Sequence, residues 1–146
     1  MSAYESGDSD AARELYTDAR VHWERIEPVA ESFCYLDPSM DAREADLGPQ
    51  EEWTGWHHIE KDLWPPAEGY ELTAEQRATL SARLLADTQE LARRVNADDF
   101  RIDAFQIGNG AKELLDEVVA GKITGEEEIW SHTDLWDFQA NIDGAL

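Results

Sequence analysis

Apolar residues recur at helical spacing through most of the chain, and no stretch shows the alternation typical of a strand. From Ser9 or Asp10 to Tyr35 this period predicts one long helix, which Pro28 is expected to bend because proline removes a backbone hydrogen bond. Its core-facing positions are Leu15, Ala19, Trp23, Ile26, Ala30, Phe33 and Cys34. Residues 1–8 are small and polar, so we expect a flexible start.

Further helices follow, separated by turn signals. The predicted spans are 53–64, 73–95, 100–120 and 131–146. Pro65 and Pro66 end the first of these, and Thr73 with Gln76 forms a capping box at the start of the second. The pattern predicts an all-α fold, an antiparallel, up-down four-helix bundle plus a short final helix, with residues 9–146 as a single helical domain.

The central predicted helix carries a His-x-x-Glu pair among tryptophans. At about 100° per residue, His57 and Glu60 fall on the apolar face of this helix. His58, Lys61 and Asp62 point the other way, and we expect His58 to be exposed. The tryptophans expected to be largely buried are Trp23, Trp53, Trp56 and Trp64. Polar groups in such surroundings need partners, so the pair is either a hydrogen-bonded part of the core or part of a metal site.

Four further acids stand where they could reach the same interior. Glu27 lies at the edge of the core face of the first helix, and Glu24 lies one step further out. Glu117 lies at the margin of the apolar stripe of the helix over 100–120. The connection before the central helix is longer than most bundle loops, and Asp41 within it either folds back over the bundle or is simply solvated.

The charge balance limits the classes of partner. The 33 acidic residues outnumber the 12 basic ones, which gives a formal net charge of −21. This charge excludes nucleic acid and anionic membranes and favours cations or basic surfaces. The single cysteine excludes an internal disulfide and a cysteine-based zinc cluster. The first residues lack the basic and apolar regions of a signal peptide, and no apolar run reaches membrane-spanning length.

Several blocks of the sequence carry a resemblance to one family. They are Glu-Arg-Ile-Glu-Pro at 24–28, Leu-Asp-Pro-x-x-Asp-Ala-Arg-Glu at 36–44, the segment 53–64, Leu-Leu-Asp-Glu-Val at 114–118, Lys-Ile-Thr-Gly-Glu-Glu at 122–127 and Ser-His-Thr-Asp-Leu-Trp-Asp-Phe at 131–138. In this order they resemble the imelysin-like family, specifically the helical domain of EfeO-type periplasmic iron-uptake proteins. The chain corresponds to roughly the first half of such a domain.

The resemblance implies a metal site and a set of ligands. The family's His-x-x-Glu falls on His57 and Glu60, its Glu-x-x-Glu on Glu24 and Glu27, its loop aspartate on Asp41, and the acid of its Leu-Leu-Asp-Glu-Val block on Glu117. It also implies a periplasmic or extracellular, envelope-associated component of bacterial iron uptake. Its partners would be iron, as Fe²⁺ or Fe³⁺, an iron permease and a peroxidase-like protein. Carboxylates with one imidazole suit iron and also accept Zn²⁺ or another divalent cation.

Two other functions remain open. A His-x-x-Glu metallopeptidase is disfavoured, because a helical zinc peptidase needs a second histidine at i+4 and position 61 is lysine. The second open function is a non-catalytic helical interaction module, since Leu135, Phe138 and Ile142 give the final helix an apolar stripe. We expect this stripe either to pack back on its own bundle or to form a homo-oligomer.

Overall fold

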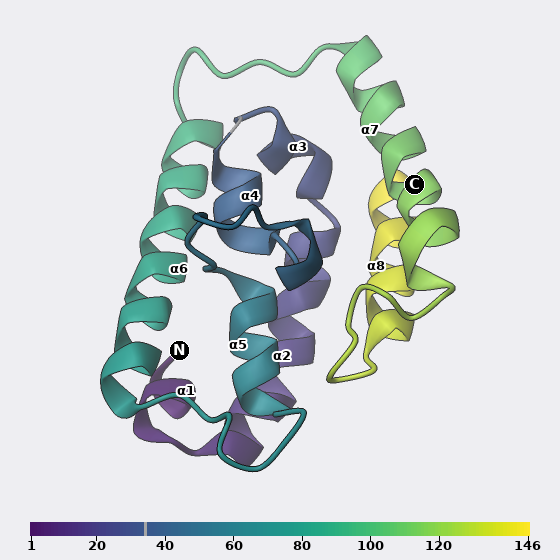
Figure 1. Cartoon of the computed structure of the whole chain (residues 1–146). Coiled ribbons are helices and arrows are strands. Elements are labelled where there is room, and N and C mark those ends of the chain that lie inside the picture. The colour runs from purple at the N-terminus through teal and green to yellow at the C-terminus, as the bar shows by residue number, and fades with distance from the viewer. Residues whose placement is uncertain (34) are drawn as a thin grey trace.

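The computed structural model describes residues 1–33 and 35–146, and within these ranges the regular elements are all helical (Figure 1). The α-helices are α1 (Ser2–Ser6), α2 (Ser9–Glu24), α3 (Glu27–Glu31), α4 (Leu36–Asp41), α5 (Trp56–Leu63), α6 (Ala74–Val95), α7 (Ala104–Glu117) and α8 (Asp134–Ala145). Glu44–Asp46 form a 3-10 turn and Val118–Lys122 a π-helical turn. The predicted all-α class is therefore confirmed. The predicted core position of Cys34 lies outside the described residues.

The long helix predicted to reach Tyr35 is divided into α2 and α3, and α4 begins just after it. α2 ends at Glu24, and Pro28 occupies the first turn of α3. Proline has no N–H to donate to the carbonyl of Glu24, and its ring opposes that carbonyl sterically. The prediction of a single bent helix is thus wrong, because the helix is completely interrupted at the expected bend. The interruption falls between Glu24 and Glu27, two of the candidate ligands.

Figure 1 shows α2, α4, α5 and α6 gathered in one group, with α7 and α8 packed together beside α2. The predicted capping box is present at the start of α6. The amide of Gln76 donates to Thr73 Oγ1 at 3.3 Å, and the amide of Thr73 donates to Gln76 Oε1 at 2.9 Å. α7 begins later than predicted because Asp103 caps it, accepting from the amides of Phe105 and Gln106.

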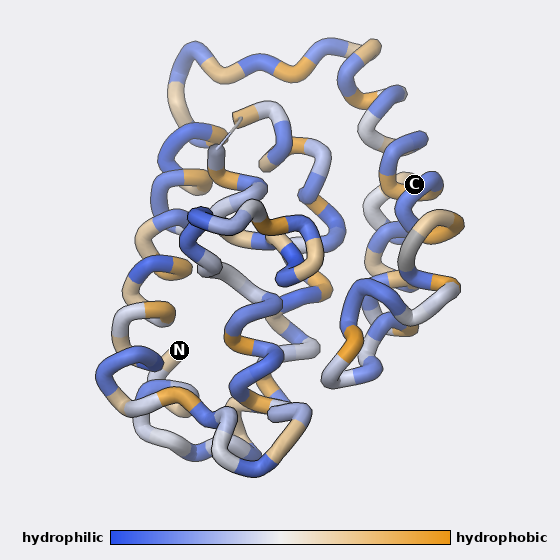
Figure 2. The backbone as a smooth tube through the Cα atoms, viewed as in Figure 1, coloured by the Kyte–Doolittle hydropathy of each residue, from blue (hydrophilic) through white to orange (hydrophobic). Residues whose placement is uncertain are grey.

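The hydrophobic core lies among α1, α2, α3, α4, α5 and α6, whose apolar positions are interspersed with polar ones along the backbone (Figure 2). Its buried members are Tyr4, Ala12, Tyr16, Trp23, Ala30, Leu36, Met40, Ile59, Leu63, Leu80, Leu84 and Leu91. Where the sequence suggested a flexible start over residues 1–8, the structure has α1, since Tyr4 is buried in this core. In the described part of the chain, no helix has the length and apolar character needed to cross a membrane.

The short helix α5 is covered on more sides than its helical wheel predicts. Lys61 and Asp62 are both buried, because Lys61 Nζ contacts Glu44 and Asp62 pairs with Arg77. His58 is partly buried, since its ring stacks on Trp53 with the ring centroids 4.4 Å apart. The predicted exposure of His58 is therefore wrong, and Lys61 and Asp62 on the same polar side of the helix are covered as well. The covering groups come from the 3-10 turn and the loop before α5, and from α6 and the segment that leads into it.

Trp23 is buried as expected, whereas the other three tryptophans predicted to be largely buried are only partly so. These are Trp53, Trp56 and Trp64. The α5 helix begins at Trp56, so Trp53 lies outside it in the preceding loop.

A glycine at the N-cap of α5 fixes the approach of this helix to α4. Gly55 has a φ of 88°, and a Cβ added there would lie 2.1 Å from the carbonyl oxygen of Met40. We expect Gly55→Ala to lower folding stability by more than the about 1–3 kcal/mol typical of a strained backbone position, because a steric clash adds to the strain. Urea unfolding monitored by tryptophan fluorescence measures this loss.

Gly108 is the matched control for that substitution. It lies within α7, and a Cβ added there meets no other atom within 4 Å. Alanine is favoured over glycine inside a helix by about 1 kcal/mol. Gly108→Ala should therefore raise stability slightly. Equal stability for the two variants would contradict the close approach of Gly55 to α4.

The final helix packs back on its own bundle. α8 contacts both α7 and α2, and its buried residues include Ala140 and Asn141. The predicted apolar stripe is only partly covered: Phe138 and Ile142 are half-buried, but Leu135 is 79% exposed. The packing face is thus rotated away from Leu135. Self-association through this helix stays a prediction, which sedimentation measurements test.

Candidate metal centre

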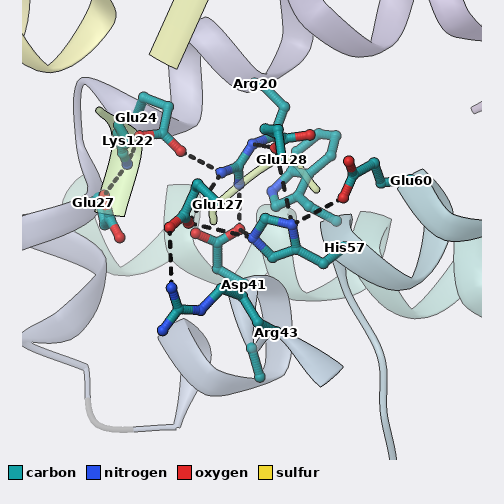
Figure 3. Close-up of polar contacts among 12 residues, drawn as sticks. Arg20, Glu24, Glu27, Asp41, Arg43, His57, Glu60, Lys122, Glu127 and Glu128 are labelled. Atoms are coloured by element: carbon teal, nitrogen blue, oxygen red, sulfur yellow. Dashed lines mark hydrogen bonds and ion pairs between the residues drawn. The ribbon is translucent and has the colours of Figure 1, made fainter. Parts of the chain in front are cut away.

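Polar side chains from distant parts of the chain meet beside α5 (Figure 3). They are Arg20 and Glu24 of α2, Glu27 of α3, Asp41 of α4, His57 and Glu60 of α5, Lys122 of the π-helical turn, and Glu127 and Glu128 of the segment before α8. Arg20, His57 and Glu60 each have an exposed fraction of 0%. The group is a buried cluster with more acids than bases.

His57 lies at the centre of this cluster, and each of its ring nitrogens faces two carboxylates. Nε2 lies 3.5 Å from Asp41 Oδ1 and 3.4 Å from Glu127 Oε1. Nδ1 lies 3.4 Å from Glu60 Oε2 and 3.9 Å from Glu128 Oε1. In each set the three candidate ligand atoms lie within 4.8 Å of one another. One histidine therefore joins two candidate metal triads, called here the Nε2 triad (Asp41, His57, Glu127) and the Nδ1 triad (His57, Glu60, Glu128).

Arg20 supplies a buried positive charge to both triads. Its guanidinium donates hydrogen bonds to Asp41 and Glu24. Its Nε lies 2.9 Å from Glu128 Oε1, and its Nη2 lies 3.8 Å from Glu127 Oε1. Because one guanidinium faces all these carboxylates, the cluster keeps an excess of negative charge that a further cation would offset.

Glu24 and Glu27 face a protein cation rather than His57. Lys122 Nζ donates to Glu24 and lies 3.8 Å from Glu27 Oε2. The side-chain amide of Asn141 also donates to Glu24 Oε2 at 3.0 Å. These two predicted ligands thus form a neighbouring compartment closed by Arg20 and Lys122, and neither belongs to a triad.

Glu117 lies on the wall of a cavity next to the Nε2 triad. This cavity of about 230 Å³ is lined by Glu27, Asp37, Pro38, Asp41, Ala42, Arg43, Asp46, Glu117 and Glu127. A second cavity, of about 260 Å³, is lined by residues that include His57 and Glu127. Arg43 borders both cavities, with its Nη1 3.6 Å from Glu127 Oε2. The structure therefore places Glu117 beside the approach to the cluster and not against His57.

Burial and charge shift the pKa values of the cluster in opposite directions. Burial raises the pKa of Glu128 well above its usual range, and it also raises the pKa of Asp41 although Arg20 opposes the shift. Burial acts the same way on Glu127, but the nearby His57 ring, Lys122 and Arg20 together outweigh it and lower the pKa of Glu127. For His57 burial favours the neutral ring, yet the contacts with Glu127 and Glu60 raise its pKa. Protons are thus shared within the cluster, and a bound cation would displace them.

Sequence reasoning found three of the five residues that form the two triads. The structure brings three of the predicted residues together, namely Asp41, His57 and Glu60. The sequence analysis did not single out Glu127 and Glu128, although they end a run of three glutamates and Glu127 lies in the Lys-Ile-Thr-Gly-Glu-Glu block. That run lies outside any helix, so no helical period could show which of its members turn inward.

The all-helical fold agrees with the family match. The chain belongs to the imelysin family (Peptidase_M75), which matches residues 1–146. It is 45% identical over 148 residues to an "Efem/EfeO family lipoprotein" of Staphylococcus haemolyticus strain JCSC1435, covering 99% of this chain and 50% of that protein. A protein of the same name from Staphylococcus aureus strain MSSA476 is 44% identical, with the same coverage. The chain thus spans about half the length of these curated relatives.

Proposed function

We propose that this protein binds iron at the cluster around His57 and serves as the metal-binding component of a bacterial EfeO-type iron-uptake system. The observation that carries the proposal is the position of one buried imidazole between two carboxylate pairs, each within metal-ligand reach. Carboxylates with one imidazole and no thiolate favour iron, in either oxidation state, over softer metals. Zn²⁺ is the main competitor, because it accepts the same ligands.

Family membership supports the setting of this function. Relatives that are 44–45% identical to the chain over 148 aligned residues carry the name lipoprotein, which supports a location at the cell envelope, periplasmic or extracellular. In that setting the bound iron would pass to a permease, with a peroxidase-like protein as a further partner. Because the chain covers half of those relatives, these partners belong to the proposal for the whole uptake system.

We further propose that the role is non-enzymatic. Each triad contains only one histidine among the described residues. Lys61 stands where a helical zinc peptidase has its second histidine, and its Nζ lies 2.6 Å from Glu44 Oε1. With zinc supplied, we expect no cleavage of casein. Cleavage that His57→Ala removes would establish the peptidase alternative instead.

Adjacent glutamates provide a direct test of the metal site. Glu127→Gln should weaken binding of Zn²⁺ or anaerobic Fe²⁺ at least about tenfold, the lower end of losses seen when groups around a metal are changed. Isothermal titration calorimetry measures the affinity. Binding should also release protons, weaken as pH falls and raise the melting temperature, because the ligands must be deprotonated and only the folded chain holds the site.

Glu126 and His22 are the matched controls for this titration. Both are exposed and both lie outside the two triads. Glu126→Gln and His22→Ala should bind metal like the unaltered protein, whereas His57→Ala should bind it poorly. If Glu126→Gln and Glu127→Gln weaken binding equally, general negative charge attracts the metal and the proposed site is wrong.

A further inference from the structure

The two triads compete for a single imidazole. A neutral imidazole offers one nitrogen lone pair to a metal, while the other nitrogen carries hydrogen and donates it. A metal in the Nε2 triad therefore requires a hydrogen-bond acceptor at Nδ1. A metal in the Nδ1 triad requires a hydrogen-bond acceptor at Nε2. The contacts of the two sides of His57 are unequal, and this inequality decides between them.

On the Nδ1 side the carboxylates already have partners. Glu60 Oε1 accepts from the backbone amides of Trp130 at 3.0 Å and Ser131 at 2.8 Å, while Oε2 faces His57 Nδ1. Glu128 Oε2 accepts from the Ser131 hydroxyl at 2.9 Å, and its Oε1 accepts from the Tyr16 hydroxyl at 3.2 Å. Both glutamates are fully buried. This side is saturated with protein donors.

On the Nε2 side the ring nitrogen is buried and has no hydrogen-bond partner. Glu127 Oε1 and Asp41 Oδ1 lie 3.4 and 3.5 Å from Nε2, within reach of a common cation. Asp41 also accepts from Arg20 and from Trp23 Nε1, so the atom that lacks a partner on this side is Nε2 itself. Both acids also line the 230 Å³ cavity, and Glu127 lines the 260 Å³ cavity with His57. A cation arriving through either cavity therefore meets this side first.

The geometry points to a metal bound by His57 Nε2, Asp41 and Glu127, with Glu60 as a positioning residue that accepts the Nδ1 hydrogen and not a ligand. The inference rests on the proposed function and assigns separate roles within that site. A ligating histidine commonly donates its other N–H to a carboxylate, which fixes the ring and increases the basicity of the ligating nitrogen. Glu60, held by two backbone amides, has that arrangement. The glutamate of the His-x-x-Glu pair thus orients the histidine.

The protonation of the two ring nitrogens tests this assignment. In ¹⁵N-labelled protein loaded with Zn²⁺, long-range ¹H–¹⁵N spectra distinguish a protonated ring nitrogen from a metal-bound one, and His57 is identified by the loss of its signals in His57→Ala. We expect a protonated Nδ1 and a Zn²⁺-bound Nε2. Zn²⁺ on Nδ1 would overturn the assignment while leaving the proposed function intact. No response of His57 to Zn²⁺ would overturn both.

Conservative variants test the difference between orienting and ligating. Glu60→Gln keeps an acceptor oxygen for Nδ1, so affinity for Zn²⁺ should fall by about ten- to a hundredfold, with Nε2 still metal-bound in the spectrum. Glu127→Gln removes a ligand and should lose more affinity than Glu60→Gln. Glu126→Gln should change neither affinity nor spectrum. A larger loss for Glu60→Gln than for Glu127→Gln would show that Glu60 is a ligand.

Discussion

Replacing Arg20 with methionine is expected to lower the free energy of unfolding by about 3–5 kcal/mol, the range for removing one partner of a buried ion pair. Arg20 is fully buried, and it donates to Asp41 and Glu24 and contacts Glu128. Methionine fills similar volume, so the loss comes from carboxylates left without their counter-ion and not from a cavity. Because a domain is stable by only about 5–15 kcal/mol, the variant should melt at a much lower temperature.

Two further measurements separate this charge effect from a general loss of packing. Zn²⁺ should stabilise Arg20→Met more than the unaltered protein, because the metal replaces part of the missing positive charge. Arg93→Met is the control: Arg93 pairs with Glu90 at the surface, where such pairs contribute about 0–1 kcal/mol. Equal urea midpoints for Arg20→Met and Arg93→Met would show that the cluster does not depend on the buried guanidinium.

Asp137→Asn is expected to stabilise the protein at pH 8 and to have a smaller effect near pH 5. Both carboxylate oxygens of Asp137 are buried without a hydrogen-bond partner, and burial raises its pKa to about 7. The unfolded chain releases this proton near pH ~3.9. Between these two pKa values the folded state holds a proton that the unfolded state has released, so stability falls as pH rises from ~3.9 and levels off above about 7. Asparagine has no such dependence.

The gain at pH 8 should be on the order of a few kcal/mol, since one pKa unit corresponds to about 1.4 kcal/mol. Urea unfolding at both pH values measures it. Asp143 lies on the same helix but is exposed and pairs with Arg25, which lowers its pKa. Asp143→Asn should therefore change stability little, and not in the stabilising direction. A gain for Asp137→Asn that is equal at pH 5 and pH 8 would contradict a charged, unpaired carboxylate.

The helical period predicted the existence of most helices but misplaced the buried face of α2. Counting apolar residues put Leu15 and Ile26 in the core, yet they are 56% and 42% exposed. The side of α2 that faces the cluster instead carries Tyr16, Arg20 and Glu24 at intervals of four residues. Two of these residues are charged, so a prediction based on apolar residues alone assigns the wrong face of α2 to the interior. The error thus affects the face of α2 that contributes Arg20 and Glu24 to the candidate site.

On α5 the same rule succeeded for one face and failed for the other. His57 and Glu60 are buried as predicted, because they share a face with Ile59 and Leu63 around the core. Lys61 and Asp62 are buried as well, since partners from distant loops cover them. A wheel treats the polar side of a helix as solvated. It contains no information on loops that fold back over that side.

Both triads join residues from opposite sides of the connection between α6 and α7. Asp41, His57 and Glu60 precede residues 96–103, whereas Glu127 and Glu128 follow them. During synthesis, the histidine is therefore made long before the acids that complete its surroundings. A partly synthesised chain ending before residue 127 has neither triad. Under the proposed function, the order of residues along the chain would therefore restrict metal loading to a polypeptide that is finished at least as far as the segment before α8.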